Sequence, residues 1–283
     1  MNDSVIAKPY KYTPLYISVK PLPARRRVGP QMTLPDLVLV HGGAHAADCW
    51  DLTIDELACR EPKLRVLAVD LPGRGRHPAD PATATLAGWA DSVVADVQEA
   101  GFHDVVVVGH SLGGLTVPGV VARLGASRVR ELILAAAFIP PQGLSVVEAL
   151  RGPLAPLARL GVRTSKSFGM PTVAASLAFC NGMSKDQRAY ALARIYGESP
   201  RVIAEAVDRR DLPDEVPRTW IMTLRDRALS QRQQHGCISA LGGVDTLICI
   251  DTCHDLMYSE PAGLAEILIE RCWHWAQHPA NAK

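Results

Sequence analysis

Six short, almost purely apolar segments recur along the chain, and they constrain the fold more than any other feature. They cover residues 37–40, 66–69, 105–108, 132–136, 219–223 and 246–250. Strands that are buried on both faces of a parallel sheet are continuous apolar runs of this kind. Helix-compatible stretches alternate with them, at residues 86–100, 112–124, 230–241 and 261–277. The alternation predicts an α/β fold in which helices flank a mostly parallel sheet.

The interval from residue 140 to residue 215 interrupts this alternation. It is helix-compatible, it is punctuated by prolines and glycines, and it separates two of the apolar segments. A structureless loop of that length is uncommon in a compact domain. We therefore expect residues 140–215 to form a helical cap over the carboxyl ends of the strands, where open α/β sheets bind ligands. The large apolar side chains that could form the core of this cap or line a pocket are Leu154, Leu157, Phe168, Met170, Phe179 and Met183.

The remaining residues divide into a core and an N-terminal segment. Residues 36–139 and 216–283 carry all six apolar segments, so we expect them to form the core. Residues 1–35 are rich in proline and arginine near their middle, and we expect an arm or an edge strand there.

Composition argues against several classes of protein. The formal net charge is +1, so no general field attracts the chain to nucleic acid or to an anionic membrane. The longest apolar stretch, residues 132–141, is too short to span a bilayer, and the first 30 residues contain no apolar signal segment. We therefore expect a cytoplasmic protein whose partner is a small-molecule substrate, and a homodimer is left open.

The seven cysteines show no spacing that is typical of a metal site or of a disulfide framework. We expect them to be free thiols in a reducing compartment, and we expect neither a metal nor a cofactor.

The most informative motif is Gly109-His-Ser-Leu-Gly113, which directly follows an apolar strand and precedes a helical stretch. A bare G-x-S-x-G arises by chance in roughly one chain in ten of this length, and the flanking pattern makes chance much less probable. A serine on a strained turn between strand and helix exposes its hydroxyl above the sheet, as a nucleophile requires. Ser111 is thus the predicted nucleophile, and the alternative is an ordinary tight turn. Pro118 is expected to kink the following helix near its second turn.

A turn with two adjacent glycines, called the glycine turn below, follows the first apolar segment in the sequence His41-Gly-Gly-Ala-His45. Such a turn can present backbone N–H groups to a developing oxyanion. We expect the N–H groups of Gly43 and Leu112 to form this oxyanion hole. His41 is expected to brace the turn, and His45 is a candidate for lining the site.

The acid and the base of a triad are expected to follow later strands, in the order serine, acid, histidine. Asp226 comes just after the segment 219–223, and His254 comes just after 246–250. Both residues should therefore lie at the same edge of the sheet as Ser111. His254 would accept the serine proton, and Asp226 would orient the ring. Weaker candidates for the acid are Asp251, Asp255, Asp211 and Asp214.

Together these motifs resemble the α/β-hydrolase superfamily over roughly residues 36–277, and within it the small esterases related to plant methylesterases and hydroxynitrile lyases. The matching stretches are Val40 to His45 with Trp50, Asp70-Leu-Pro-Gly-Arg-Gly75 and Gly109 to Gly114, with Asp226 and His254 after them. Lyases of that group carry threonine at the position of Gly42 and a lysine soon after the catalytic histidine. Here Asp255-Leu-Met-Tyr follows His254.

The resemblance implies a carboxylic ester hydrolase that acts on a small, partly apolar substrate through an acyl-serine intermediate. Hydrolysis of a lactone, a thioester or a C–C bond, or a lyase reaction, would use the same triad and remains an alternative. A non-catalytic ligand-binding protein is a further alternative, since a fold does not fix a function.

Overall fold

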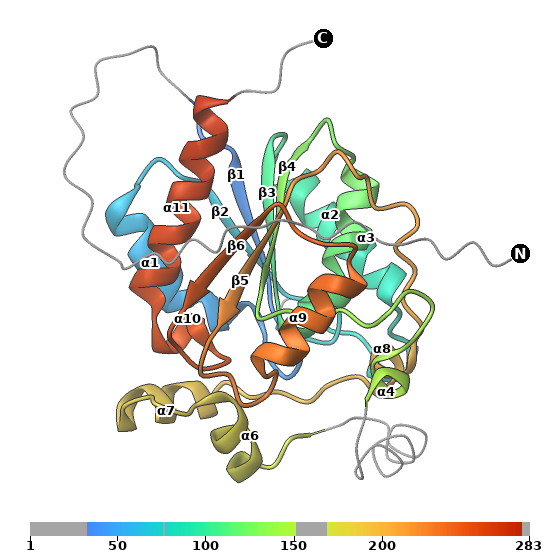
Figure 1. The fold of residues 1–283 in the computed structure, drawn as a ribbon, viewed down its shortest axis with the longest axis vertical. Helices are drawn as coiled ribbons and strands as arrows, with labels where there is room; N and C mark the ends of the chain where they lie inside the picture. The colour runs from blue at the N-terminus through green and yellow to red at the C-terminus, as the bar shows by residue number, and fades with distance from the viewer. Residues whose placement is uncertain (1–32, 76, 151–168, 279–283) are drawn as a thin grey trace, which may run out of the picture.

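The apolar segments form one parallel sheet. In the computed structural model, which describes residues 33–75, 77–150 and 169–278, the strands follow the order β2-β1-β3-β4-β5-β6, and every neighbouring pair is parallel (Figure 1). The strands are β1 (Asp36–Val40), β2 (Val66–Val69), β3 (Val105–His110), β4 (Val129–Ala135), β5 (Arg218–Thr223) and β6 (Thr246–Ile250). The predicted α/β class is therefore confirmed.

Helices cover both faces of this sheet (Figure 1). On one face lie α1 (Asp51–Arg60) and α11 (Pro261–Gln277), and on the other lie α2 (Leu86–Glu99), α3 (Val117–Leu124) and α9 (Gln231–Ala240). Successive side chains of a strand point to opposite faces. Leu37 and Leu39 of β1 accordingly join the core under α1 and α11, while Val38 joins the core under α2 and α3. Burial of both faces explains why the strands are mainly apolar.

The helix after Ser111 differs from its prediction. Residues Ser111–Leu115 form a 3-10 helix (η3), and α3 begins only at Val117. Pro118 therefore lies in the first turn of α3, where a missing N–H leaves no hydrogen bond unmade. The expected kink near the second turn was wrong, because the helical stretch is divided in front of the proline.

Four short helices occur among the described residues between β4 and β5. They are α4 (Val146–Ala149), α6 (Thr172–Phe179), α7 (Lys185–Leu192) and α8 (Pro200–Ala204). Figure 1 shows them together at one end of the sheet. Leu154, Leu157 and Phe168 lie outside the described residues, as does the expected N-terminal arm up to residue 32. The division into core, cap and arm stays a prediction.

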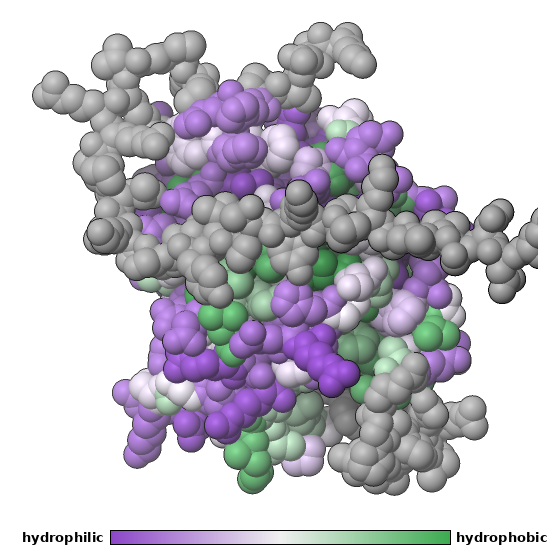
Figure 2. Space-filling model, in the orientation of Figure 1, coloured by the Kyte–Doolittle hydropathy of each residue, from purple (hydrophilic) through white to green (hydrophobic). Residues whose placement is uncertain are grey.

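The surface around α6 carries exposed apolar side chains. Val173 and Leu177 of α6 are 72% and 60% exposed. Figure 2 shows hydrophobic surface at the lower end of the molecule, where Figure 1 places α6. None of the described helices has the combination of length and apolar character that a membrane span requires. The cytoplasmic location stays a prediction.

A buried polar group ties the middle of the sheet to the C-terminal helix. Glu131 of β4 is fully buried, and its carboxylate accepts hydrogen bonds from Arg271 Nε (3.0 Å) and Trp275 Nε1 (2.8 Å) of α11. Thr219 of β5 also donates to it. These donors compensate the cost of burying the charge. All seven cysteines are free thiols.

Candidate active site

The three residues of the predicted triad meet at the carboxyl edge of the sheet. Ser111 directly follows β3, Asp226 follows β5, and His254 follows β6. His254 Nε2 lies 2.8 Å from Ser111 Oγ, and His254 Nδ1 lies 2.7 Å from Asp226 Oδ2. The fold thus brings together three side chains that are far apart in the chain, in one line of hydrogen bonds.

Ser111 lies on a strained turn. Its φ angle is +48°, in the left-handed region that non-glycine residues seldom adopt. The turn also passes very close to the chain after β1, since a Cβ on Gly113 would lie 2.8 Å from the carbonyl oxygen of His41. Only glycine fits at position 113 without displacing backbone. The strain and the close approach fix the serine hydroxyl at the end of β3.

Asp226 is held as an oriented anion. Its Oδ1 accepts from the N–H groups of Ala228 (2.8 Å) and Leu229 (2.7 Å), and its Oδ2 accepts from Thr223 Oγ1 (2.8 Å). Burial alone would raise the pKa of Asp226, but the charge of His254 and these donors bring it below its ordinary value. An ionised Asp226 accepts a hydrogen bond from the Nδ1–H of His254, which keeps the proton on Nδ1 and leaves the Nε2 lone pair free to accept a hydrogen bond from Ser111.

The weaker candidates for the acid have other surroundings. Asp251 is 73% exposed and pairs with Arg225 at 3.0 Å, while Asp255 pairs with His45. Asp211 and Asp214 are exposed. Among the candidates, the carboxylate that contacts His254 Nδ1 is that of Asp226.

His41 braces the turn that was expected to supply an oxyanion donor. Its Nδ1 donates to the carbonyl of Gly42 (2.8 Å), and its Nε2 accepts from the N–H of Leu71 (3.1 Å). The ring is neutral in this arrangement, and burial lowers its pKa to about 3. The Gly42 carbonyl and the Gly43 N–H belong to one trans peptide and point in opposite directions. Fixing the carbonyl therefore fixes the direction of the Gly43 N–H.

Leu112 is the second residue of η3, and the first N–H groups of a helix have no acceptor within it. A Cβ added to Gly43 would collide with the side chain of Leu112, so the two expected donors lie on adjoining turns, and their role stays a prediction.

Glu198 and Arg74 were not singled out as site residues from the sequence, whereas Phe179 was among the candidates for the cap core or the pocket lining. The carboxylate of Glu198 accepts from the N–H of Ala44 (3.1 Å) and pairs with Arg74 Nη2 (2.8 Å), and both side chains are buried. The ring of Phe179 in α6 stacks on the imidazole of His254, with 5.2 Å between the centroids. These contacts join segments more than 70 residues apart, so no local pattern could have indicated them.

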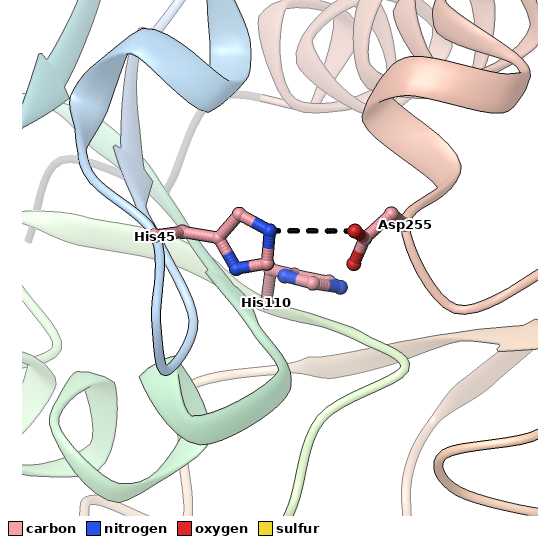
Figure 3. A group of neighbouring side chains, drawn as sticks. All are labelled: His45, His110 and Asp255. Carbon is pink, nitrogen blue, oxygen red and sulfur yellow. Dashed lines mark ion pairs between the residues drawn. The ribbon is translucent and has the colours of Figure 1, made fainter. Parts of the chain in front are cut away.

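Behind His254 lies a buried cluster of His45, His110 and Asp255 (Figure 3). Each of these three residues offers one potential metal-binding atom, and the three atoms all lie within 4.8 Å of one another. His45 was a candidate for lining the site, but its side chain is only 1% exposed and is engaged inside the fold. The expected absence of a metal stays a prediction.

Comparison with known proteins places the chain in a family. The model of the alpha/beta hydrolase family matches residues 37–267, which is most of the chain. The chain belongs to the alpha/beta hydrolase family. The resemblance that the sequence motifs indicated is thereby confirmed, and the sheet order and helices described above are those of an alpha/beta hydrolase.

Individual relatives of this alpha/beta hydrolase match over shorter stretches. A carbendazim hydrolyzing esterase from Nocardioides sp. is 33% identical over 44% of the chain and 50% of its own length. A pimeloyl-[acyl-carrier protein] methyl ester esterase from Vibrio campbellii is 41% identical over 36% of the chain and 37% of its own length. The match therefore spans half or less of the length of these two curated relatives.

A solved structure covers far more of the chain. An extracellular alpha/beta-hydrolase from a Paenibacillus species superposes with a TM-score of 0.74 at 23% identity, over 83% of this chain and 98% of that one. That protein is described as sharing structural and functional homology with tobacco salicylic acid binding protein 2. At this identity the likeness shows that the two proteins share a fold.

Proposed function

We propose that this alpha/beta hydrolase is a serine esterase that cleaves carboxylic esters through an acyl-serine intermediate. The proposal depends above all on the unbroken line from Asp226 through His254 to Ser111, with hydrogen bonds of 2.7 and 2.8 Å. A hydroxyl becomes a competent nucleophile when a base accepts its proton and a third group orients that base. The strained turn at Ser111 supports the same role.

The proposed reaction has two halves. Ser111 Oγ attacks the ester carbonyl while its proton passes to His254 Nε2, and the charge of Asp226 stabilises the resulting imidazolium. The N–H groups of Gly43 and Leu112 hold the oxyanion. Its collapse breaks the bond to the alkoxy oxygen, which leaves as an alcohol with the proton of His254. Water then gives a proton to His254, attacks the acyl-serine, and the carboxylic acid is released as the proton returns to Ser111.

We expect esters to be the substrates because relatives of this chain are esterases by name. The two curated relatives are an esterase that acts on carbendazim and an esterase that acts on a methyl ester. The stacking of Phe179 on the imidazole places an apolar ring beside the reacting atoms, which suits a small and partly apolar ester. Methyl esters are therefore the first class of substrate to test.

The decisive experiment is the substitution Ser111→Ala. With p-nitrophenyl acetate and butyrate, kcat should fall on the order of a million-fold, as in other serine triads. Ser239→Ala, at an exposed serine of α9, is the matched control and should keep full activity. A fluorophosphonate probe should label the wild type and the control but not Ser111→Ala. Turnover that survives in Ser111→Ala would exclude the mechanism, and a panel of methyl esters, lactones and thioesters would separate the reaction classes.

A further inference from the structure

A second histidine and a second aspartate form a buried pair directly behind the triad. His45 belongs to the glycine turn after β1, and Asp255 lies between His254 and α10 (Leu256–Ser259). His45 Nε2 lies 3.3 Å from Asp255 Oδ2, and the two side chains are 1% and 0% exposed (Figure 3). The pair thus joins the turn with the proposed oxyanion donor Gly43 to the turn with His254.

Both nitrogens of the His45 ring face acceptors. Nδ1 lies 2.9 Å from the carbonyl oxygen of Gly43, and Nε2 faces the carboxylate of Asp255. A neutral imidazole has one N–H and one lone pair, so one of these nitrogens would turn a lone pair toward an oxygen. A doubly protonated ring donates through Nδ1 to the Gly43 carbonyl, and its Nε2–H, 3.3 Å from Asp255 Oδ2, places a positive charge beside the fully buried carboxylate.

The other groups around the ring do not supply that charge. His110 lies at the end of β3 and Tyr258 in α10, while Asp48 and Cys49 lie in the 3-10 helix η1 (Ala47–Trp50). Burial lowers the pKa of His110 to about 3, so that ring is neutral. Arg74 donates to the backbone carbonyl of His45, but its guanidinium pairs with Glu198.

We propose that His45 is a buried imidazolium. Its ion pair with Asp255 fixes the position of the glycine turn (residues 41–45) relative to the loop that carries His254. His45 and Asp255 are then positioning residues for the ester hydrolysis proposed above, on which their effect on rate depends. Burial alone would lower the pKa of His45, but Asp255 raises it above its ordinary value, and His45 in turn holds the pKa of Asp255 below its usual range.

The first test reads the protonation state and needs no activity. In ¹⁵N-labelled protein at pH 8, long-range ¹H–¹⁵N spectra should show both ring nitrogens of His45 protonated, with the assignment taken from His45→Asn. One unprotonated nitrogen would overturn the proposal. So would a stoichiometric metal ion in protein purified without chelator, because the cluster would then be a metal site.

The second test reads the consequence for catalysis. His45→Asn keeps an amide donor for the Gly43 carbonyl but leaves the charge of Asp255 unpaired. Displacing a reacting group by about 1 Å costs on the order of 100-fold, so kcat should fall roughly 10- to 100-fold while KM changes less than about threefold. A boronic acid that adds to Ser111 should lose affinity in parallel with kcat. The double variant His45→Asn/Asp255→Asn, which pairs two neutral amides, should recover at least about tenfold of the lost kcat.

His235→Asn, at an exposed position of α9, is the matched control. A folded His45→Asn protein with unchanged kcat, or with unchanged boronate affinity, would overturn the positioning role. A failure of the proposed function would appear differently, as activity that persists in Ser111→Ala.

Discussion

Replacing Gly42 by alanine tests how closely the glycine turn approaches the nucleophile. A Cβ at this position would lie 2.8 Å from Ser111 Cβ and 2.9 Å from His110 Nδ1. Non-bonded carbon atoms prefer about 3.5 to 4.0 Å, so one partner must move by about 0.7 Å or more. The His110 ring cannot swing away, because it is buried and its Nε2 donates to the carbonyl of His254 (3.1 Å). The displacement must therefore act on Ser111 or on the glycine turn.

Either displacement should reduce the rate of acylation. Moving Ser111 lengthens its 2.8 Å hydrogen bond to His254, and an error of about 1 Å in such a position costs on the order of 100-fold. Moving the turn withdraws the Gly43 N–H, and the loss of one oxyanion donor costs about 100- to 1000-fold. We expect kcat of Gly42→Ala to be about 100-fold below wild type, with KM changed much less. Pre-steady-state acylation by p-nitrophenyl acetate, normalised by active-site titration, measures the effect.

The matched control is Gly236→Ala in α9, where an added Cβ has no atom within 4 Å. It should keep full activity and gain roughly 0.5 to 1 kcal/mol of stability, because alanine favours a helix over glycine. Thermal unfolding of both variants shows whether a loss of activity comes from loss of the fold or from displacement of Ser111 and the glycine turn. A folded Gly42→Ala protein with kcat within threefold of wild type would refute the argument from close approach.

Three further substitutions test the carboxylates and a buried histidine. Asp226→Asn should lower kcat about 10⁴-fold at pH 7, because the ring loses its orienting anion; a loss below tenfold in steady-state assays would contradict its role. Burial lowers the pKa of His110 to about 3, against about 6.5 when unfolded, so its stabilising effect is present above pH 6.5 and is lost as the pH falls toward 3. The advantage of wild type over His110→Gln in urea unfolding should therefore shrink by about 1.4 kcal/mol between pH 7.5 and 5.5; a constant difference would contradict the shift. Glu131→Ala leaves the partly buried Arg271 without its carboxylate partner and should lower the free energy of unfolding by about 3 to 5 kcal/mol. A free energy from urea unfolding within about 1 kcal/mol of wild type would refute this.

The strands and the Ser111 turn could be predicted from the sequence because their signals are local. A strand buried on both faces is apolar at most of its positions, and the turn at Ser111 requires glycines two residues before and after it. The helix α1 was missed, since only Thr53 and Leu57 of its ten residues are buried and its apolar periodicity is weak. The division at Thr116 between η3 and α3 was missed as well, because it depends on how the serine turn packs under the chain after β1.

The sequence by itself determined that Ser111, Asp226 and His254 would lie at one edge of the sheet. Parallel strands end at the same edge, and each of these residues comes within four residues of the end of a strand. Only the tertiary structure decided which carboxylate faces His254. Asp255 is its neighbour in the chain, yet Asp226 lies at 2.7 Å from Nδ1, while Asp255 turns away to His45. Contacts between loops of different strands depend on side-chain packing across the whole edge, and no stretch of sequence contains that information.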